Sequence, residues 1–194
     1  MKCKNATGFL KQIKGNIFQT VWFTGLLLWG LLGVSSADVR HRLIVLADMG
    51  NEPDEMQQMV HMITCSNEFD IEGLIAVTGI HLRPEDPIAY QRVTHPELFL
   101  NIIDAYEKDL SNLKKHACTW PDPNALRQVV VAGQKGYGID DVGQGKSSPG
   151  SELIIKALTK NVPRPVWIVV NAGSNCFDMQ FCLIFGKNTI TYKK

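Results

Sequence analysis

Three carboxylates lie close together in the sequence, directly after a short apolar run. Asp48 follows the run at residues 43–47, and Asp54 and Glu55 come within the next seven positions. Carboxylates crowded in this way repel one another, and a cation among them relieves the repulsion. Oxygen ligands of this kind suit calcium or magnesium. A purely structural interpretation stands beside this one, in which Asp48 caps a loop and Asp54 and Glu55 are first-turn acids of a helix.

The elements around these acids are readable from the hydrophobic pattern. The continuous apolar run at 43–47 predicts a parallel strand that is buried on both faces. Pro53 is typical of a first helical turn, and apolar residues at helical spacing follow it as far as Ile63. A second buried strand is expected over residues 70–78. Strand, helix and strand in this order predict a right-handed βαβ unit.

The rest of the chain continues this alternation. The further elements expected are a long helix from Pro96 with an apolar stripe as far as Ala117, a short helix or strand over 125–131, a glycine-rich loop over 133–150, a helix beginning at Pro149 and capped by Ser148, and a third buried strand over 165–170. Strands that alternate with helices predict an α/β fold with a doubly wound, mostly parallel, Rossmann-like sheet. Trp120 and Trp167 are expected in its core.

Polar residues follow each predicted strand. Asp48 follows the first strand, Thr78 ends the second, and residues 171–175 follow the third. Ligands of open parallel sheets bind outside the carboxyl ends of the strands, so these residues predict a cleft at one edge of the sheet. His81 lies just beyond the second strand and is a candidate for binding substrate there. The loop at 136–145 is either a mobile surface loop or a lid over the cleft; it lacks the context of a phosphate-binding loop.

The sequence around the acids resembles a known family. Residues 43–56, LIVLADMGNEPDEM, are similar to the opening motif of the nucleoside-hydrolase-like domain of a cellulose-binding-protein family. The similarity continues through SNEFDIEGLIA at 66–76, Gly136-Tyr-Gly138 and Arg164-Pro-Val-Trp167, and it covers about residues 40–175. The run Gly-Asn-Glu-Pro-Asp at 50–54 is its most specific part. The family in turn resembles the inosine-uridine nucleoside hydrolases.

The resemblance implies a role for each acid in a calcium site that also binds a sugar. Asp48 is similar to the metal ligand that takes a proton from the attacking water, and Asp54 to the acceptor of ribose hydroxyls. Glu55 corresponds to the second metal carboxylate, although the family pattern usually has Asp at this position. A backbone carbonyl near Asn171 is implied as a further metal ligand. Asn175 resembles the residue that closes the sugar pocket.

Three functional hypotheses follow. The first is a calcium-dependent hydrolase of N-glycosidic bonds that acts on a nucleoside or another glycoside. The second is a secreted carbohydrate- or cellulose-binding module without turnover. The third is an inactive fragment, because the tail at 176–194 no longer resembles the family and the domain at 38–175 is expected to be incomplete. A sheet cut short in this way is expected to have an unpaired edge and an uncovered apolar face.

The first 37 residues are predicted to be a signal peptide. Four lysines and no acids precede an apolar stretch at 21–34, and Ser35-Ser36-Ala37 resembles a cleavage site. An uncleaved membrane anchor is the alternative, and otherwise no contact with the membrane is expected. We therefore expect a protein that is secreted or lumenal. Removing the four leader lysines changes the net charge from +1 to −3, and a body without a basic block indicates no nucleic-acid partner.

Four cysteines remain after this segment, namely Cys65, Cys118, Cys176 and Cys182. A secretory route permits disulfides between them. The alternative that the sequence favours is that Cys65 and Cys118 are ordinary buried thiols on helices. The oligomeric state is not indicated by any pattern in the chain.

Overall fold

The computed structural model describes residues 40–178, so the predicted signal peptide and most of the divergent tail, with Cys182, lie outside the described residues. Within this range the chain forms one sheet of four parallel strands, in the order β3-β2-β1-β4. The strands are β1 (His41–Ala47), β2 (Phe69–Ala76), β3 (Val130–Ala132) and β4 (Val166–Val170). The predicted α/β class is confirmed.

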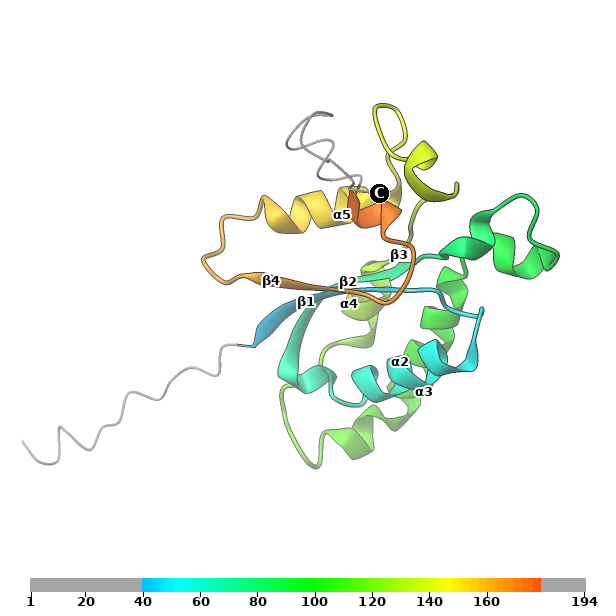
Figure 1. The fold of residues 1–194 in the computed structure, drawn as a ribbon. Coiled ribbons are helices and arrows are strands. Elements are labelled where there is room, and N and C mark those ends of the chain that lie inside the picture. The colour runs from blue at the N-terminus through cyan, green and yellow to red at the C-terminus, as the bar shows by residue number, and fades with distance from the viewer. Residues whose placement is uncertain (1–39, 179–194) are drawn as a thin grey trace, which may run out of the picture. The chain divides into compact units, whose positions relative to one another are not determined.

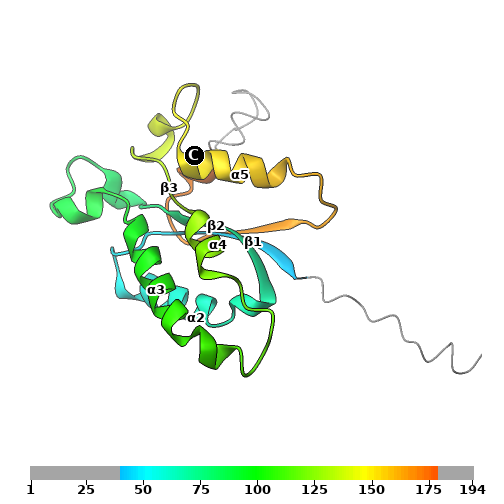
Figure 2. The same ribbon diagram turned by 180° about the vertical axis from the view of Figure 1, so that it is seen from behind.

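Helices cover the sheet on both faces. The helices are α2 (Pro53–Ile63), α3 (Pro96–Leu113) and α4 (Pro123–Gln128) on one face and α5 (Pro149–Leu158) on the other (Figure 1; the reverse view is Figure 2). Alternate residues of β1 point to opposite faces, so Leu43 and Val45 join the core under α2 and α3, whereas Ile44 and Leu46 pack toward α5. The prediction of a first strand buried on both faces is therefore confirmed.

The chain reverses its direction of winding between β1 and β4. It proceeds outward from β1 through β2 to β3, and it then crosses the other face through α5 and returns to pair β4 with β1. The predicted doubly wound topology is thus confirmed. In such sheets the strand order reverses at the place where a crevice opens outside the carboxyl ends. Here that place lies between the end of β1 and the end of β4.

Several boundaries differ from the sequence-based expectation. The strand β1 begins earlier, at His41, and β2 ends at Ala76, two residues before Thr78. Residues 125–131 contain both elements that were considered, because α4 ends at Gln128 and β3 begins at Val130. The Asp122 side chain caps α4 by accepting from the backbone N–H groups of Asn124 and Ala125. The long helix α3 ends at Leu113, before Ala117, and the indole N–H of Trp120 donates to the Leu113 carbonyl.

The predicted start of α5 is confirmed. Ser148 Oγ accepts from the backbone N–H of Ser151, and the Ser151 hydroxyl in turn accepts from the backbone N–H of Ser148. This reciprocal pair satisfies two N–H groups that a helix start leaves without intrahelical partners. Four short 3₁₀ turns complete the described elements, at Ser66–Glu68, Ile80–Leu82, Ala89–Arg92 and Gly138–Asp141.

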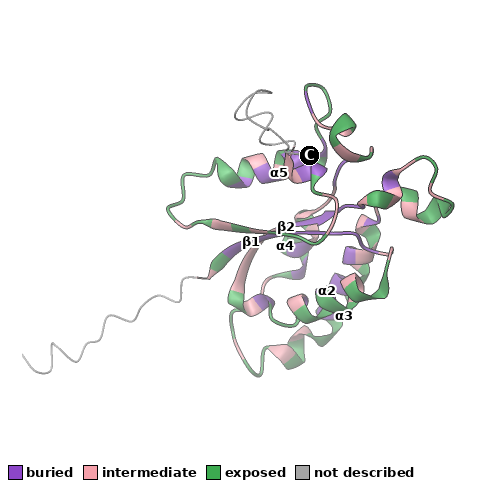
Figure 3. Cartoon of the chain, in the orientation of Figure 1, coloured by how far each residue is buried: buried purple, intermediate pink, exposed green. Residues whose placement is uncertain are grey.

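The expectation that the strand over 165–170 is buried is wrong. Trp167 is 59% exposed, and Val169 and Val170 are also exposed. Accordingly β4 is drawn in the colours of intermediate and exposed residues, with none in that of buried ones (Figure 3). The physical reason is that β4 lies at the edge of the sheet, beyond the area that α2 and α3 cover. Trp167 therefore does not belong to the core, whereas Trp120 packs against it as expected. Within residues 40–178 the predicted unpaired edge and uncovered apolar face are both present.

The expectation for the cysteines is wrong for two of them. Cys65 and Cys118 are exposed and lie in the turns that follow α2 and α3 rather than on helices. Cys176 is buried beside Ser148, and burial raises the pKa of its thiol to about 11. All three are free thiols, so the pairing permitted by a secretory route is not formed among the described cysteines.

Within residues 40–178 no helix has the length and apolar character needed to cross a membrane.

Candidate functional site

The turn after β1 aims Asp48 into the protein. Gly50 has φ = +93°, and a β-carbon there would lie 2.8 Å from Leu98 Cδ1 and 2.9 Å from the Tyr90 hydroxyl. Only glycine combines this backbone conformation with such a close approach. The turn is closed by the backbone N–H of Asn51, which donates to the Asp48 carbonyl over 3.2 Å. As a result the Asp48 side chain is buried at the carboxyl end of the strand.

A hydrogen-bond network joins this turn to the next strand end and to the loop beyond it. The Asn51 side-chain amide donates to Thr78 Oγ1 over 2.7 Å and to Asp48 Oδ2 over 3.4 Å. Gln91 Nε2 donates to the Asn51 carbonyl over 3.1 Å, and the Thr78 hydroxyl donates to the Gln91 carbonyl over 3.3 Å. The sequence indicated Thr78 as a strand end, but no pattern indicated Gln91, because it lies in a 3₁₀ turn without periodicity.

Three buried oxygens in this region have no hydrogen-bond partner among the described residues. They are Asp48 Oδ1, Asn51 Oδ1 and Glu55 Oε2. Leaving a buried polar atom unpaired costs about 1–3 kcal/mol, so three neighbouring cases need a physical explanation. All three atoms are acceptors, and carboxylate and amide oxygens are the ligands that hard divalent cations take.

Glu55 is the acid whose charge is most affected by this environment. Its pKa is raised to about 7, first by burial and then by the negative charge of Asp48, and the nearby carboxylates of Asp48 and Asp54 favour the protonated form further. Two ionised carboxylates are both acceptors and cannot pair, so only a proton on Glu55, or a cation, would give these oxygens a partner. Glu55 therefore keeps its proton to a higher pH than an ordinary carboxyl group does. A perturbed carboxyl at a strand end is characteristic of functional sites.

A second grouping of acids lies on the outer side of the same helix start. One carboxylate oxygen from each of Glu52, Asp54 and Glu55 falls within 4.8 Å of the others. Glu52 and Asp54 are exposed, and exposed acids in a first helical turn are stabilised by the helix dipole without any ion. The buried oxygens of Asp48, Asn51 and Glu55 are therefore the stronger candidates for a ligand set. Glu55 belongs to both groupings.

Two other predicted site residues, Asn171 and His81, lie outside the acidic turn after β1. Asn171 follows β4, where its backbone N–H donates to the Leu46 carbonyl over 3.0 Å and its exposed side chain donates to Gln58 Oε1 over 3.1 Å. It therefore borders the point where the strand order reverses, on the side opposite Asp48. His81 pairs with Asp86 within its own loop, through Nδ1 and Oδ2 at 2.9 Å.

Asn175 is buried and holds the backbone of two loops. Its Nδ2 donates to the Gly136 carbonyl over 2.8 Å, and its Oδ1 accepts from the Cys176 N–H over 3.0 Å. The structure thus brings Asp48, Asp54 and Glu55 together, while the side chains of Asn175 and His81 are engaged in bonds within the protein. The binding roles of Asn175 and His81 stay predictions.

A cavity of about 490 Å³ lies at the same carboxyl edge, next to Thr78. It is open to solvent and is bordered by the loop after β2, the loop before α5 and the turn after β4. Its lining residues are Thr78, Gly79, Ile80, Tyr137, Gly138, Ile139, Gly173, Ser174, Asn175 and Asp178. Its volume is within the range of ligand sites. The loop at 136–145, predicted as a surface loop or a lid, therefore contributes one wall of this cavity.

Comparison with known proteins agrees with this geometry. Residues 42–181 match the family described as the nucleoside hydrolase-like domain of cellulose-binding Sde182. A solved structure of a nucleoside hydrolase-related hypothetical protein from Saccharophagus degradans, described as associated with carbohydrate metabolism, superposes with a TM-score of 0.67 at 37% identity.

The superposition covers 78% of this chain and 35% of that one, so the chain spans about a third of the length of the solved relative. None of the curated proteins matches. The resemblance inferred from the acidic turn is confirmed by both matches. The chain belongs to the family of cellulose-binding Sde182 nucleoside hydrolase-like domains.

Proposed function

We propose that this domain hydrolyses the bond between a sugar and its leaving group, as in the N-glycosidic bond of a nucleoside or a related glycoside, at the turn after β1. The observation that carries the proposal is the set of three buried, unpartnered acceptor oxygens on Asp48, Asn51 and Glu55. They lie where the strand order reverses, which is the usual ligand position of such sheets. The membership in a nucleoside hydrolase-like family supports the same reaction class.

The donor set fits a calcium ion. The carboxylates of Asp48 and Glu55, the side-chain oxygen of Asn51 and the backbone carbonyl near Asn171 would hold it, since calcium takes six to eight oxygens in flexible geometry. When bound, such an ion offsets the carboxylate charges and lowers the pKa of a water molecule. The flexibility of calcium coordination accommodates Glu55 in place of the shorter Asp.

The protein's own groups account for the remaining chemistry. The Asp48 carboxylate would act as the general base that accepts a proton from water, an effect that contributes roughly 10²–10⁴-fold to a rate. Asp54, exposed in the first turn of α2, would accept hydrogen bonds from the sugar hydroxyls. The negative charge of the cluster would stabilise the positive charge that develops on the sugar in the transition state. Asn175 and His81 are proposed to border the sugar from the neighbouring loops.

The test is a hydrolysis assay with the purified full chain. Nucleosides are incubated with the protein in calcium or in EDTA, and the release of free base and of reducing sugar is followed. Release is expected in calcium only, and it should be lost in Asp48→Asn, which keeps the shape of the side chain without its charge. Equal release by wild type and Asp48→Asn would rule out the proposed reaction.

A second candidate function is carbohydrate binding without turnover. It is favoured by the description of the family as cellulose-binding and by the internal bonds that occupy the Asn175 side chain. Retention of the protein on insoluble glucans, together with loss of retention in Asp54→Ala, would support it. Retention that is unchanged in Asp54→Ala would place binding outside the acidic turn.

We also propose that the protein enters the secretory pathway. Support comes from the lysine-rich start, the apolar stretch and the small residues at 35–37. Expression in a secreting host, followed by N-terminal sequencing of protein from the medium, tests this. The mature chain should begin at Asp38.

A further inference from the structure

The cavity beside the acidic turn has walls of two different kinds. Ile80, Tyr137 and Ile139 form an apolar and aromatic wall, and all three are exposed. Ser174 and Asp178 form a polar wall, where the Ser174 hydroxyl donates to Asp178 Oδ2 over 3.2 Å. A ligand in this cavity would therefore meet an apolar surface on one side and hydrogen-bond acceptors on the other.

Tyr137 is held in place by a residue from a different loop. The guanidinium carbon of Arg83 lies 4.5 Å from the centre of the tyrosine ring, and Arg83 Nη2 donates to the Tyr137 hydroxyl over 2.7 Å. A cation against an aromatic ring is attractive even at an exposed site. Arg83 follows β2, whereas Tyr137 precedes α5, so the two contacts connect the loops on either side of the cavity.

The backbone before Tyr137 is fixed as well. The Gly136 N–H donates to Asp141 Oδ2 over 2.7 Å, and the Gly136 carbonyl accepts from Asn175 Nδ2 over 2.8 Å. Tyr137 is nevertheless 39% exposed, and the space where a Gly138 side chain would project has no atom within 4 Å. The result is a preorganised aromatic ring with open space beside it, which reduces the entropy lost on binding.

The chemistry of the walls selects a class of ligand. A sugar ring presents apolar C–H groups on one face and hydroxyl groups at its edge, which matches an aromatic wall opposite a polar one. The described lining contains one carboxylate, Asp178, and no Lys, Arg or His. Neutral polyols would donate hydroxyl hydrogens to this carboxylate, and the positive charge nearest the cavity, on Arg83, is already engaged with Tyr137.

We propose that this cavity is a binding subsite for a neutral sugar ring, with Tyr137 as the stacking platform and Arg83 as the residue that positions it. The cavity adjoins the acidic turn through Thr78, which accepts a hydrogen bond from Asn51. The subsite rests on the proposed function for the sugar at that turn, and it adds glycosides whose leaving group is a neutral sugar to the substrates that the turn could accept.

Calorimetric titration of the full chain with cellotetraose tests the subsite directly. Tyr137→Ala should weaken binding about 5- to 10-fold, because aromatic contacts contribute on this scale. Tyr137→Phe should remain within about twofold of wild type, because it keeps the ring. Trp167→Ala is the matched control: Trp167 is an exposed aromatic residue of β4 outside the cavity lining, and its removal should leave the affinity unchanged.

The same titrations separate this inference from the proposed function. Asp48→Asn should lose turnover and calcium binding but keep the dependence of cellotetraose affinity on Tyr137. Ile139→Asp, which changes a second exposed side chain of the apolar wall, should also weaken binding, and circular dichroism checks that each variant is folded. The subsite is overturned if wild type does not bind cellotetraose, if Tyr137→Ala binds equally well, or if adenosine binds more tightly with the same dependence on Tyr137.

Discussion

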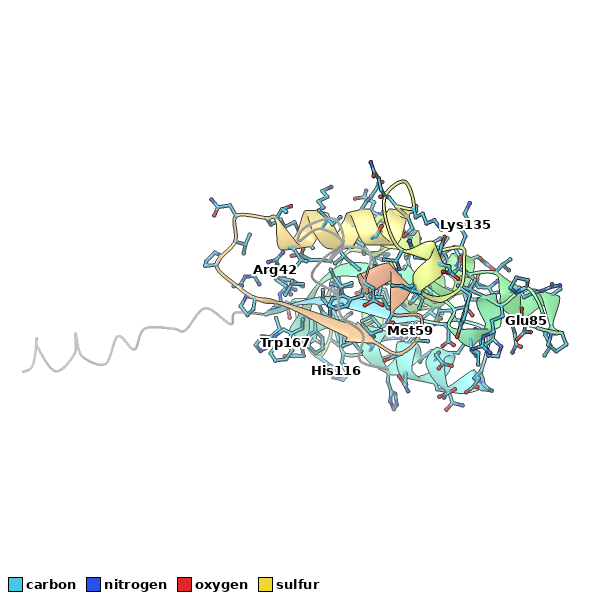
Figure 4. The ribbon with its side chains drawn as sticks, turned by 45° about the horizontal axis from the view of Figure 1, so that its top comes forward. Arg42, Met59, Glu85, His116, Lys135 and Trp167 are labelled. Carbon is cyan, nitrogen blue, oxygen red and sulfur yellow. The ribbon has the colours of Figure 1, made fainter. Side chains whose placement is uncertain are left out.

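Among residues 40–178, buried charged side chains are paired at the amino ends of the strands and have oxygens without partners at the carboxyl ends. At the amino ends of the strands, Arg42 is only 3% exposed, yet its guanidinium donates to both Glu72 oxygens, at 2.7 and 3.1 Å, and to the Ala157 carbonyl. At the carboxyl ends, oxygens of Asp48 and Glu55 are buried without partners among the described residues. Figure 4 shows Arg42 at one end of the sheet, away from the loops that carry Glu85 and Lys135.

This difference indicates that charged groups stabilise the fold at the amino ends of the strands and destabilise it at the carboxyl ends. At the amino end the two acids of β2 have basic partners, since Lys160 also pairs with Glu72, and Arg40 and Arg164 both pair with Asp70. A buried charge that loses its partner is strongly destabilising. At the carboxyl end like charges are held together, which lowers stability unless a ligand compensates for them. Buried, mismatched charge is the expected signature of a binding site.

The largest expected effect is at the amino end. Arg42→Ala should lower the free energy of unfolding by about 3 kcal/mol, because among residues 40–178 it leaves the partly buried Glu72 with Lys160 as its one remaining ion-pair partner. Urea denaturation measures the change. Arg127→Ala is the matched control, because Arg127 also bridges two acids, Asp104 and Glu107, but both are exposed; its effect should be close to zero. Equal losses of stability in Arg42→Ala and Arg127→Ala would show that burial of the ion pair does not increase its contribution to stability.

A change of opposite sign is expected at the carboxyl end. In EDTA at pH 8, Glu55→Gln should stabilise the fold by about 1 kcal/mol, because it removes a charge that faces Asp48 and supplies an amide donor to an unpaired acceptor. The same variant should bind calcium more weakly, as measured by calorimetry. Destabilisation in EDTA would mean that the acids are not in conflict, and the contrast between the two ends would fail.

The two ends should also respond to different ranges of pH. The pKa of Glu72 is lowered, chiefly by its hydrogen bond to Arg42, so its stabilisation is present above its ordinary pKa of 4.5 and is lost as the pH falls below that value. The pKa of Glu55 is raised to about 7, so the folded state keeps a proton that the unfolded state releases, and stability in EDTA falls as the pH rises from 4.5 to about 7.

Thermal melts across this range distinguish the two contributions. Glu55→Gln should remove the loss on the alkaline side, and Glu72→Gln should remove the loss on the acid side. Calcium should reduce the alkaline loss in wild type, because its affinity rises as Glu55 ionises. Superimposable profiles for wild type and Glu55→Gln would contradict the assignment.

The smallest expected effect sharpens the comparison within the amino half of the sheet. Trp167 pairs in register with Leu43, next to Arg42, but it is exposed. Trp167→Lys should change the free energy of unfolding by about 0.5 kcal/mol or less. A large loss of stability in Trp167→Lys would show that an exposed side chain of β4 can contribute as much to folding as the buried, ion-paired Arg42.

Much of the fold was predictable because its signals are local. The apolar run before Asp48, the prolines that begin α2 and α3, and the Ser148 cap each act within one turn or strand. The short strand β3 and the exposure of Trp167 were not predictable in this way. β3 is three residues long, and the face that β4 exposes depends on how far α2 and α3 extend across the sheet.

The residues of the candidate site also fall into those with a local sequence signal and those placed only by tertiary contacts. Asp48, Asp54 and Glu55 are close in sequence and were recognised from spacing and resemblance. Gln91 was not, because it reaches Asn51 from a segment 40 residues away. The contact of Arg83 with Tyr137, which lies 54 residues further along the chain, was equally invisible.

By itself the sequence determined the class of fold, the acidic turn and the family, since each depends on residues within about one helix or strand of each other. Only the tertiary structure decided which oxygens are left without partners, which acid has its pKa raised, and which loops enclose the cavity. The reason is that burial and charge coupling depend on through-space distance. Parallel strands bring the ends of distant segments to one edge, and the sequence order does not contain those distances.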